Sequence, residues 1–125
     1  MGAAKSNKRI LVLDKDSRLI DPVDDVLAEG GWDVQFTYDP NAVYDLAKAN
    51  RPDLVILDFL LLDLDCKTIC DDFRADPDLR SIPIMVVTRY KTRKTTKAAY
   101  QCDALFVKPV DVGIVASHID YLMAS

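Results

Sequence analysis

The feature of the sequence that most restricts its fold is a regular alternation of short apolar runs with helix-like segments. Five such runs occur, over residues 10–13, 34–37, 54–57, 84–87 and 105–107. Of the four runs that are four residues long, three are continuously apolar, as expected for strands covered on both faces, whereas the run from Val34 to Thr37 alternates in polarity, which is typical of an edge strand. Repeated strand and helix units of this kind predict an α/β domain built around a parallel sheet.

Helical spacing of apolar residues predicts five helices between and after these runs. The first carries apolar residues three and four apart from Leu19 to Leu27, has Pro22 in its first turn, where proline costs little, and ends at Gly30. Residues 92–101 contain few apolar side chains, so this helix has the weakest amphipathic pattern. The other three helices are expected over residues 41–49, 67–74 and 112–122.

Length and composition fit one soluble domain. Of the 125 residues, 50% are apolar, which suits a single core, and we expect a flexible segment over residues 1–8 followed by one domain over residues 9–125. No apolar stretch approaches the roughly 20 residues that span a bilayer, and the first residues lack a secretory signal, so we expect a cytoplasmic protein without membrane contact. A formal net charge of -4 disfavours direct binding of nucleic acid.

The cysteine and histidine residues do not indicate a metal or catalytic site. Cys66 and Cys70 lie one helical turn apart, but the second pair that a zinc site needs is missing, so we expect reduced and mostly buried thiols. The single histidine, His118, falls in the last helix without a neighbouring acid-base group. We interpret it as a surface or half-buried residue rather than a phosphodonor.

Four polar residues follow directly after apolar runs, where the strands are expected to end. They are Asp14, Asp58, Thr88 and Lys108. One such residue is explained as a cap or a turn residue, but an acid, a second acid, a hydroxyl and a lysine together are not. Because the carboxyl ends of parallel strands line the ligand crevice of an open α/β sheet, we expect the four side chains to converge there.

These residue types suit a site that accepts a phosphoryl group. A carboxylate that attacks phosphorus meets an anion, so cationic and hydrogen-bonding groups must stabilise the transferred oxygens. Lys108 supplies positive charge, and Thr88 supplies a hydroxyl donor. Asp14, next to Asp58, would help to attract a divalent cation.

The segments PDLVILD, IPIMVVT and FVKP, in this order, resemble the receiver domains of bacterial response regulators over nearly the whole chain. The resemblance implies a flavodoxin-like (βα)5 three-layer sandwich with a parallel five-stranded sheet in the order 2-1-3-4-5. It also implies Asp58 as the phosphoacceptor, Thr88 as the switch hydroxyl, Lys108 as the lysine of the family's motif, and a cis bond before Pro109.

The resemblance further implies the partners and the cofactor. The phosphoryl donor would be a sensor histidine kinase or a phosphotransfer protein, and a downstream protein partner would bind the face formed by residues 91–125. Such a domain is a monomer or weak homodimer, and it is a signalling domain that assists its own phosphoryl transfer rather than an enzyme. Mg²⁺ would be held by Asp14, Asp58 and the backbone carbonyl of Leu60.

Several residues depart from the family's pattern. Lys15 replaces the second acid after the first strand, which predicts weakened Mg²⁺ binding, and Asp16 is not expected to take that acid's place because side chains alternate along a strand. The Lys15 ammonium would lie either near Asp58 or in solvent. Leu105 replaces the family's aromatic switch residue, while Phe106 should face the opposite way.

The loops after the third and fourth runs depart as well. Arg89 replaces a small residue after the switch hydroxyl, and Leu62-Asp63 and Cys66 replace a Pro-Gly pair and a glycine. Two other loop positions tune dephosphorylation in similar receivers, and here they carry bulky side chains, Leu60 and Tyr90.

Three functions follow as hypotheses. The first is a phosphorylatable receiver, and the second is a degenerate receiver-like interaction module that works without phosphorylation, an alternative suggested by Lys15 and Leu105. A flavin or nucleotide enzyme on the same fold is disfavoured, because neither a GxxxxGK[ST] nor a GxGxxG loop occurs.

Overall fold

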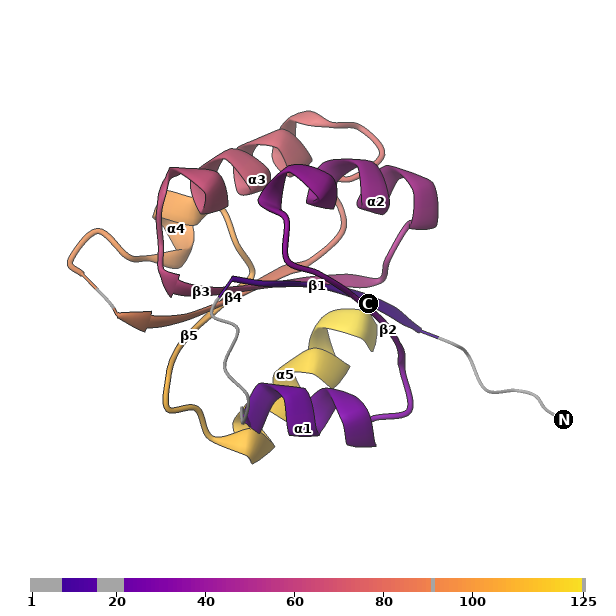
Figure 1. The fold of residues 1–125 in the computed structure, drawn as a ribbon, viewed down its shortest axis with the longest axis vertical. Helices are drawn as coiled ribbons and strands as arrows, with labels where there is room; N and C mark the ends of the chain where they lie inside the picture. The colour runs from indigo at the N-terminus through magenta and orange to yellow at the C-terminus, as the bar shows by residue number, and fades with distance from the viewer. Residues whose placement is uncertain (1–7, 16–21, 91, 125) are drawn as a thin grey trace, which may run out of the picture.

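The computed structural model describes residues 8–15, 22–90 and 92–124 (Figure 1). The strands are β1 (Arg9–Asp14), β2 (Asp33–Thr37), β3 (Leu54–Leu61), β4 (Ile84–Tyr90) and β5 (Ala104–Val107). The helices are α1 (Pro22–Glu29), α2 (Val43–Asn50), α3 (Leu64–Ala75), α4 (Lys97–Tyr100) and α5 (Val112–Ala124), and a 3-10 turn (Pro40–Ala42) precedes α2. None of the helices in these three segments is long and apolar enough to cross a membrane.

All five strands form one parallel sheet in the order β2-β1-β3-β4-β5, which confirms the predicted flavodoxin-like topology. Figure 1 shows α1 and α5 on one face of the sheet and α2, α3 and α4 on the other. Buried side chains form one core cluster on each face. Val12, Ile56 and Ile119 belong to the α1–α5 side, whereas Leu57 and Phe73 belong to the α2–α3 side.

The prediction of an edge strand over residues 34–37 is confirmed, because β2 pairs with β1 alone and its residues are exposed or half-buried. Pro22 is the first residue of α1, as expected. Leu19 and Ile20, which were predicted to begin that helix, lie outside the described residues. The same holds for the predicted flexible segment over residues 1–8, apart from Lys8.

Helix α4 is much shorter than the predicted helix over residues 92–101. The backbone N–H of Thr92 donates to the Thr95 hydroxyl, and the N–H of Thr95 donates back to the Thr92 carbonyl, so these residues close a turn of their own. The helix begins only after Thr96, whose hydroxyl accepts from the N–H of Ala99. Local bonding by threonine side chains thus competes with helix formation.

Strands β3 and β4 are longer than their apolar runs. The prediction that Asp58 and Thr88 end their strands is therefore wrong: pairing continues to Leu61 on β3 and Tyr90 on β4. Both polar residues are buried, and their backbone groups are satisfied within the sheet, so neither interrupts the ladder.

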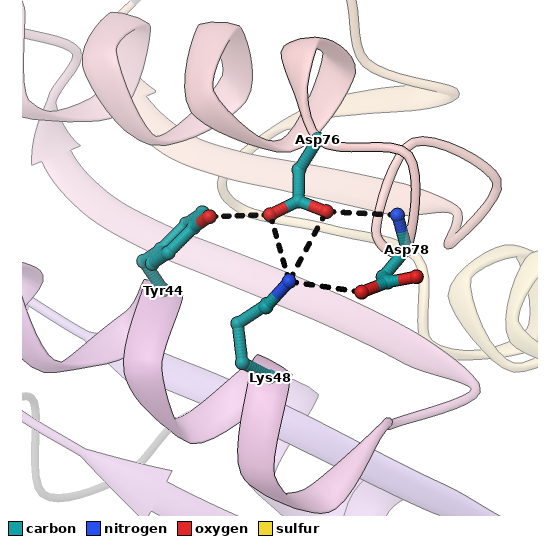
Figure 2. Close-up of polar contacts among 4 residues, drawn as sticks. All are labelled: Tyr44, Lys48, Asp76 and Asp78. Atoms are coloured by element: carbon teal, nitrogen blue, oxygen red, sulfur yellow. Dashed lines mark hydrogen bonds and ion pairs between the residues drawn. The ribbon is translucent and has the colours of Figure 1, made fainter.

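A buried carboxylate ties α2 to the loop that follows α3 (Figure 2). Asp76 accepts hydrogen bonds from the Tyr44 hydroxyl, from the Lys48 ammonium at 3.1 Å and from the backbone N–H of Asp78 at 2.8 Å. These donors, above all the Tyr44 hydroxyl, lower the pKa of Asp76 to about 2. The hydrogen bond to Asp76 raises the pKa of Tyr44, and hydrogen bonds first to the Asp78 side chain and then to Asp76 raise the pKa of Lys48.

We expect Asp76→Asn to destabilise the protein at neutral pH and to lose about half of that effect at pH 3. A carboxylate whose pKa is lowered on folding contributes stability above its unfolded pKa, near 3.8, and loses it as the pH falls toward 2. Urea unfolding at pH 6 and pH 3 measures the difference. Asp78→Asn, at an exposed position that contacts only Lys48 through its side chain, is the control and should change stability less. An Asp76→Asn effect that is equal at both pH values would contradict this account.

Candidate functional site

The carboxyl edge of the sheet gathers the acids predicted from the sequence. Asp14 is the last residue of β1, and it pairs in register with Asp58 on the neighbouring strand β3. Val12 and Ile56, two residues before each acid, belong to the α1–α5 core cluster. Because side chains alternate along a strand, both acids lie on that same face.

Lys108 joins Asp58 in a buried ion pair. Its ammonium lies 3.0 Å from Oδ2 of Asp58, and the two side chains are only 4% and 5% exposed. Lys108 follows β5 directly, and its backbone N–H donates to the Thr88 carbonyl at 2.8 Å. The lysine therefore reaches Asp58 across the intervening strand β4. The peptide bond between Lys108 and Pro109 is cis, as expected.

The Thr88 hydroxyl is held by backbone carbonyls. It donates toward Leu60 O at 3.3 Å and Tyr90 O at 3.2 Å, and the side chain is fully buried. Val86, two residues earlier, belongs to the α2–α3 cluster, so Thr88 lies on the opposite face of the sheet from Asp58. The structure thus places Thr88 at the same edge as the acids, but it does not join the hydroxyl to Asp58.

Lys15 lies exposed just after the end of β1, where its backbone contacts β3. Its backbone N–H donates to the Asp58 carbonyl at 2.7 Å, which fixes the segment after β1 against β3, while the residue as a whole is exposed. Asp16 lies outside the described residues.

The donor set does not match a complete divalent-cation site. Among residues 8–15, 22–90 and 92–124, no group of three His, Cys, Asp or Glu side chains is placed to hold a metal ion. The Leu60 carbonyl, predicted as a ligand, accepts from Thr88 instead. Asp14 and Asp58 remain as two adjacent carboxylates, whereas the exposed Lys15 stands where other receivers carry a second acid after the first strand.

The residues that replace the family's aromatic switch lie as expected. Leu105 packs against the α2–α3 cluster and Phe106 against the α1–α5 cluster, so the two face opposite sides of the sheet. Phe106 also contacts the exposed His118 ring edge to face, with centroids 5.1 Å apart.

The three cysteines are free and buried, as predicted. Burial raises the pKa of Cys102 to about 11, which keeps this thiol protonated at neutral pH. Reduced, inert thiols in the core are consistent with these surroundings.

One residue of this edge was not assigned to the site from sequence. Val87 belongs to the α1–α5 cluster and pairs with Asp58, and Arg89 follows two places later on the same strand. Alternation places the half-buried Arg89 on the face that carries Asp58. Counting two residues on from an apolar position of β4 would have found it.

A model of the response regulator receiver domain matches residues 10–120. The chain belongs to this receiver-domain family. It is 30% identical to the DNA-binding dual master transcriptional regulator RpaA of Synechocystis sp. over 117 aligned residues. The alignment covers 92% of this chain and 48% of RpaA. The chain thus spans about half the length of that relative. It is 24% identical to the polar-differentiation response regulator DivK of Brucella anthropi, over 84% of this chain and 87% of DivK.

Solved receiver structures share the fold. The receiver domain of sensor histidine kinase PA1611 from Pseudomonas aeruginosa superposes with a TM-score of 0.77 at 18% identity, covering 96% of this chain and all of that one. That structure holds a magnesium ion in its active-site cleft. Receiver domains generally bind Mg²⁺ at this place and interact with histidine kinases or phosphotransfer proteins.

We expect Lys108→Met to destabilise the protein by about 3 kcal/mol, because it removes the cationic partner of a buried carboxylate. The control is Lys67→Met, which breaks a partly exposed pair with Asp71 one turn along α3 and should cost at most about 0.5 kcal/mol. Urea unfolding measures both. Equal losses of unfolding free energy in the two variants would show that the buried Asp58–Lys108 pair stabilises the protein no more than a partly exposed pair does.

Proposed function

We propose that this receiver domain accepts a phosphoryl group on Asp58 from a phosphohistidine of a sensor histidine kinase or phosphotransfer protein. The observation that carries the proposal is the ion pair between Asp58 and Lys108, at the carboxyl edge of a parallel sheet and beside a second acid. A carboxylate held by a lysine is ionised and fixed in place, which is what a nucleophile toward phosphorus requires.

In the transfer, a carboxylate oxygen of Asp58 attacks phosphorus while the bond from phosphorus to the donor's imidazole nitrogen breaks. The electron pair of that bond returns to the imidazole, and Asp58 becomes an acyl phosphate. Lys108 then lies beside the phosphoryl oxygens, which carry the negative charge of the acyl phosphate, and stabilises that charge. The domain thereby assists its own phosphorylation.

The signal would start at Thr88. Its hydroxyl donates to the carbonyls of Leu60 and Tyr90, both near the ends of extended strands. A phosphoryl oxygen on Asp58 is a stronger, charged acceptor, so the hydroxyl would exchange these partners for it. The ends of β3 and β4 would then shift, and the shift would reach a downstream protein through the face formed by residues 91–125.

Incubation with acetyl phosphate, with and without magnesium, followed by intact-protein mass spectrometry tests the assignment. We expect one added phosphoryl group, and none in Asp58→Asn, which keeps the shape of the side chain but cannot attack phosphorus. Asp53→Asn, which alters a carboxylate after α2, is the control and should be phosphorylated like the parent. If the parent gains no mass with any donor, the domain works as an interaction module without phosphorylation.

We further expect the phosphoryl group on Asp58 to hydrolyse slowly. Leu60 lies two residues after Asp58 and Tyr90 two residues after Thr88, at 40% and 59% exposure, and an apolar side chain at the first position neither orients an attacking water nor leaves it much room. Leu60→Asn combined with Tyr90→Glu should speed decay about ten-fold, which corresponds to roughly 1.4 kcal/mol of barrier.

Loss of phosphorylated mass after donor removal measures this rate. Tyr121→Glu, at an exposed position on α5, introduces the same charge elsewhere and should leave the rate unchanged. A double variant that decays no faster than the parent would mean that these side chains do not screen the phosphoryl group from water.

A further inference from the structure

We propose that Arg89 contacts the phosphoryl group on Asp58 and, with Lys108, supplies the positive charge that a divalent cation supplies in other receivers. The inference rests on the proposed function, because it concerns the same site. It predicts a receiver whose phosphorylation continues when magnesium is removed.

The strand register brings Arg89 to the site. Asp58 pairs with Val87, and Thr88 pairs with Val107, so Arg89 on β4 lies level with Lys108. The Lys108 side chain reaches Asp58 from the far side of β4, and Arg89 comes from β4 itself, on the face that carries Asp58. A separation of about 4.8 Å between strands and two residues along the strand place the Arg89 and Asp58 backbones roughly 8 Å apart, within reach of a long side chain.

The charges at the edge explain why a further cation is needed. Asp14 and Asp58 are adjacent carboxylates, and Lys108 forms an ion pair with Asp58. A phosphoryl group adds more negative charge to the same place, and Lys15 stands where other receivers carry an acid that binds the metal. The half-buried Arg89 is on the right face to compensate.

A guanidinium suits this role better than an ammonium would. It stays protonated at any physiological pH, and its planar fork of N–H donors can bond two phosphoryl oxygens at once. It donates hydrogen bonds throughout the transfer and neither gains nor loses a proton, so the bonds made and broken are those of the proposed transfer.

The rate of phosphorylation by acetyl phosphate, measured in excess EDTA and in excess magnesium, tests the proposal. We expect the parent to slow by less than about three-fold on chelation, and Arg89→Ala to lose at least about thirty-fold in EDTA, as is usual when a donor to a developing anion is removed. Arg89→Lys, which keeps the charge but not the fork, should fall between them. Arg93→Ala removes an exposed cation from the loop after β4 and should behave as the parent.

A variant that removes Arg89 and restores the acid for magnesium tests whether the two cations play the same role. Lys15→Asp in the Arg89→Ala background restores an acid where other receivers carry a metal ligand. We expect this double variant to be phosphorylated rapidly with magnesium and to lose that rate in EDTA. Circular dichroism and urea unfolding of each variant check that it is folded.

Binding of beryllofluoride, followed by fluorine NMR in EDTA, gives a second readout that needs no chemical step. The parent should bind this phosphoryl mimic without metal, and Arg89→Ala should not. If the parent reacts and binds only with magnesium, and Arg89→Ala matches it, the role of Arg89 is overturned while Asp58 remains the phosphoacceptor. If the parent neither reacts nor binds beryllofluoride in any condition, both proposals fail.

Discussion

The ion pair between Asp58 and Lys108 is the interaction on which the functional edge of this domain depends. A carboxylate and an ammonium that are both almost fully buried must satisfy one another, since an isolated charge in such a place is very unfavourable. The contact also spans β4 and thereby links the third strand to the segment after the fifth. Asp14 lies beside this pair on the neighbouring strand, and Arg89 lies two residues beyond the β4 partner of Asp58.

The core of the fold was predictable because it follows from burial. A strand covered on both faces must be apolar throughout, so the runs at residues 54–57 and 84–87 could be recognised without any tertiary information. Their ends could not. In the sequence, Asp58 and Thr88 look like the ends of their strands. Each is buried and hydrogen-bonded to a distant segment, so the pairing of β3 with β4 continues beyond them.

The candidate site, like the core, was predictable from the sequence only in part. The residue types at 14, 58, 88 and 108 predicted a phosphoryl-acceptor edge, and the structure brings these positions to one edge of the sheet. Which face each side chain takes depends on strand register, and register is fixed by packing rather than by residue type. For that reason the separation of Thr88 from Asp58 became visible only once the strands were paired.

The two carbonyls that hold the Thr88 hydroxyl have a consequence for how sharply such a domain responds. A hydroxyl without a partner would move to a new acceptor with the full strength of the new bond. Here the driving force is only the difference between a charged acceptor and the neutral carbonyls that share the single hydroxyl proton, so the difference in free energy between the resting and signalling conformations is small. Phosphorylation would then change the proportions of two coexisting conformations, and a partner that prefers one of them would contribute as much to the final balance as the phosphoryl group itself.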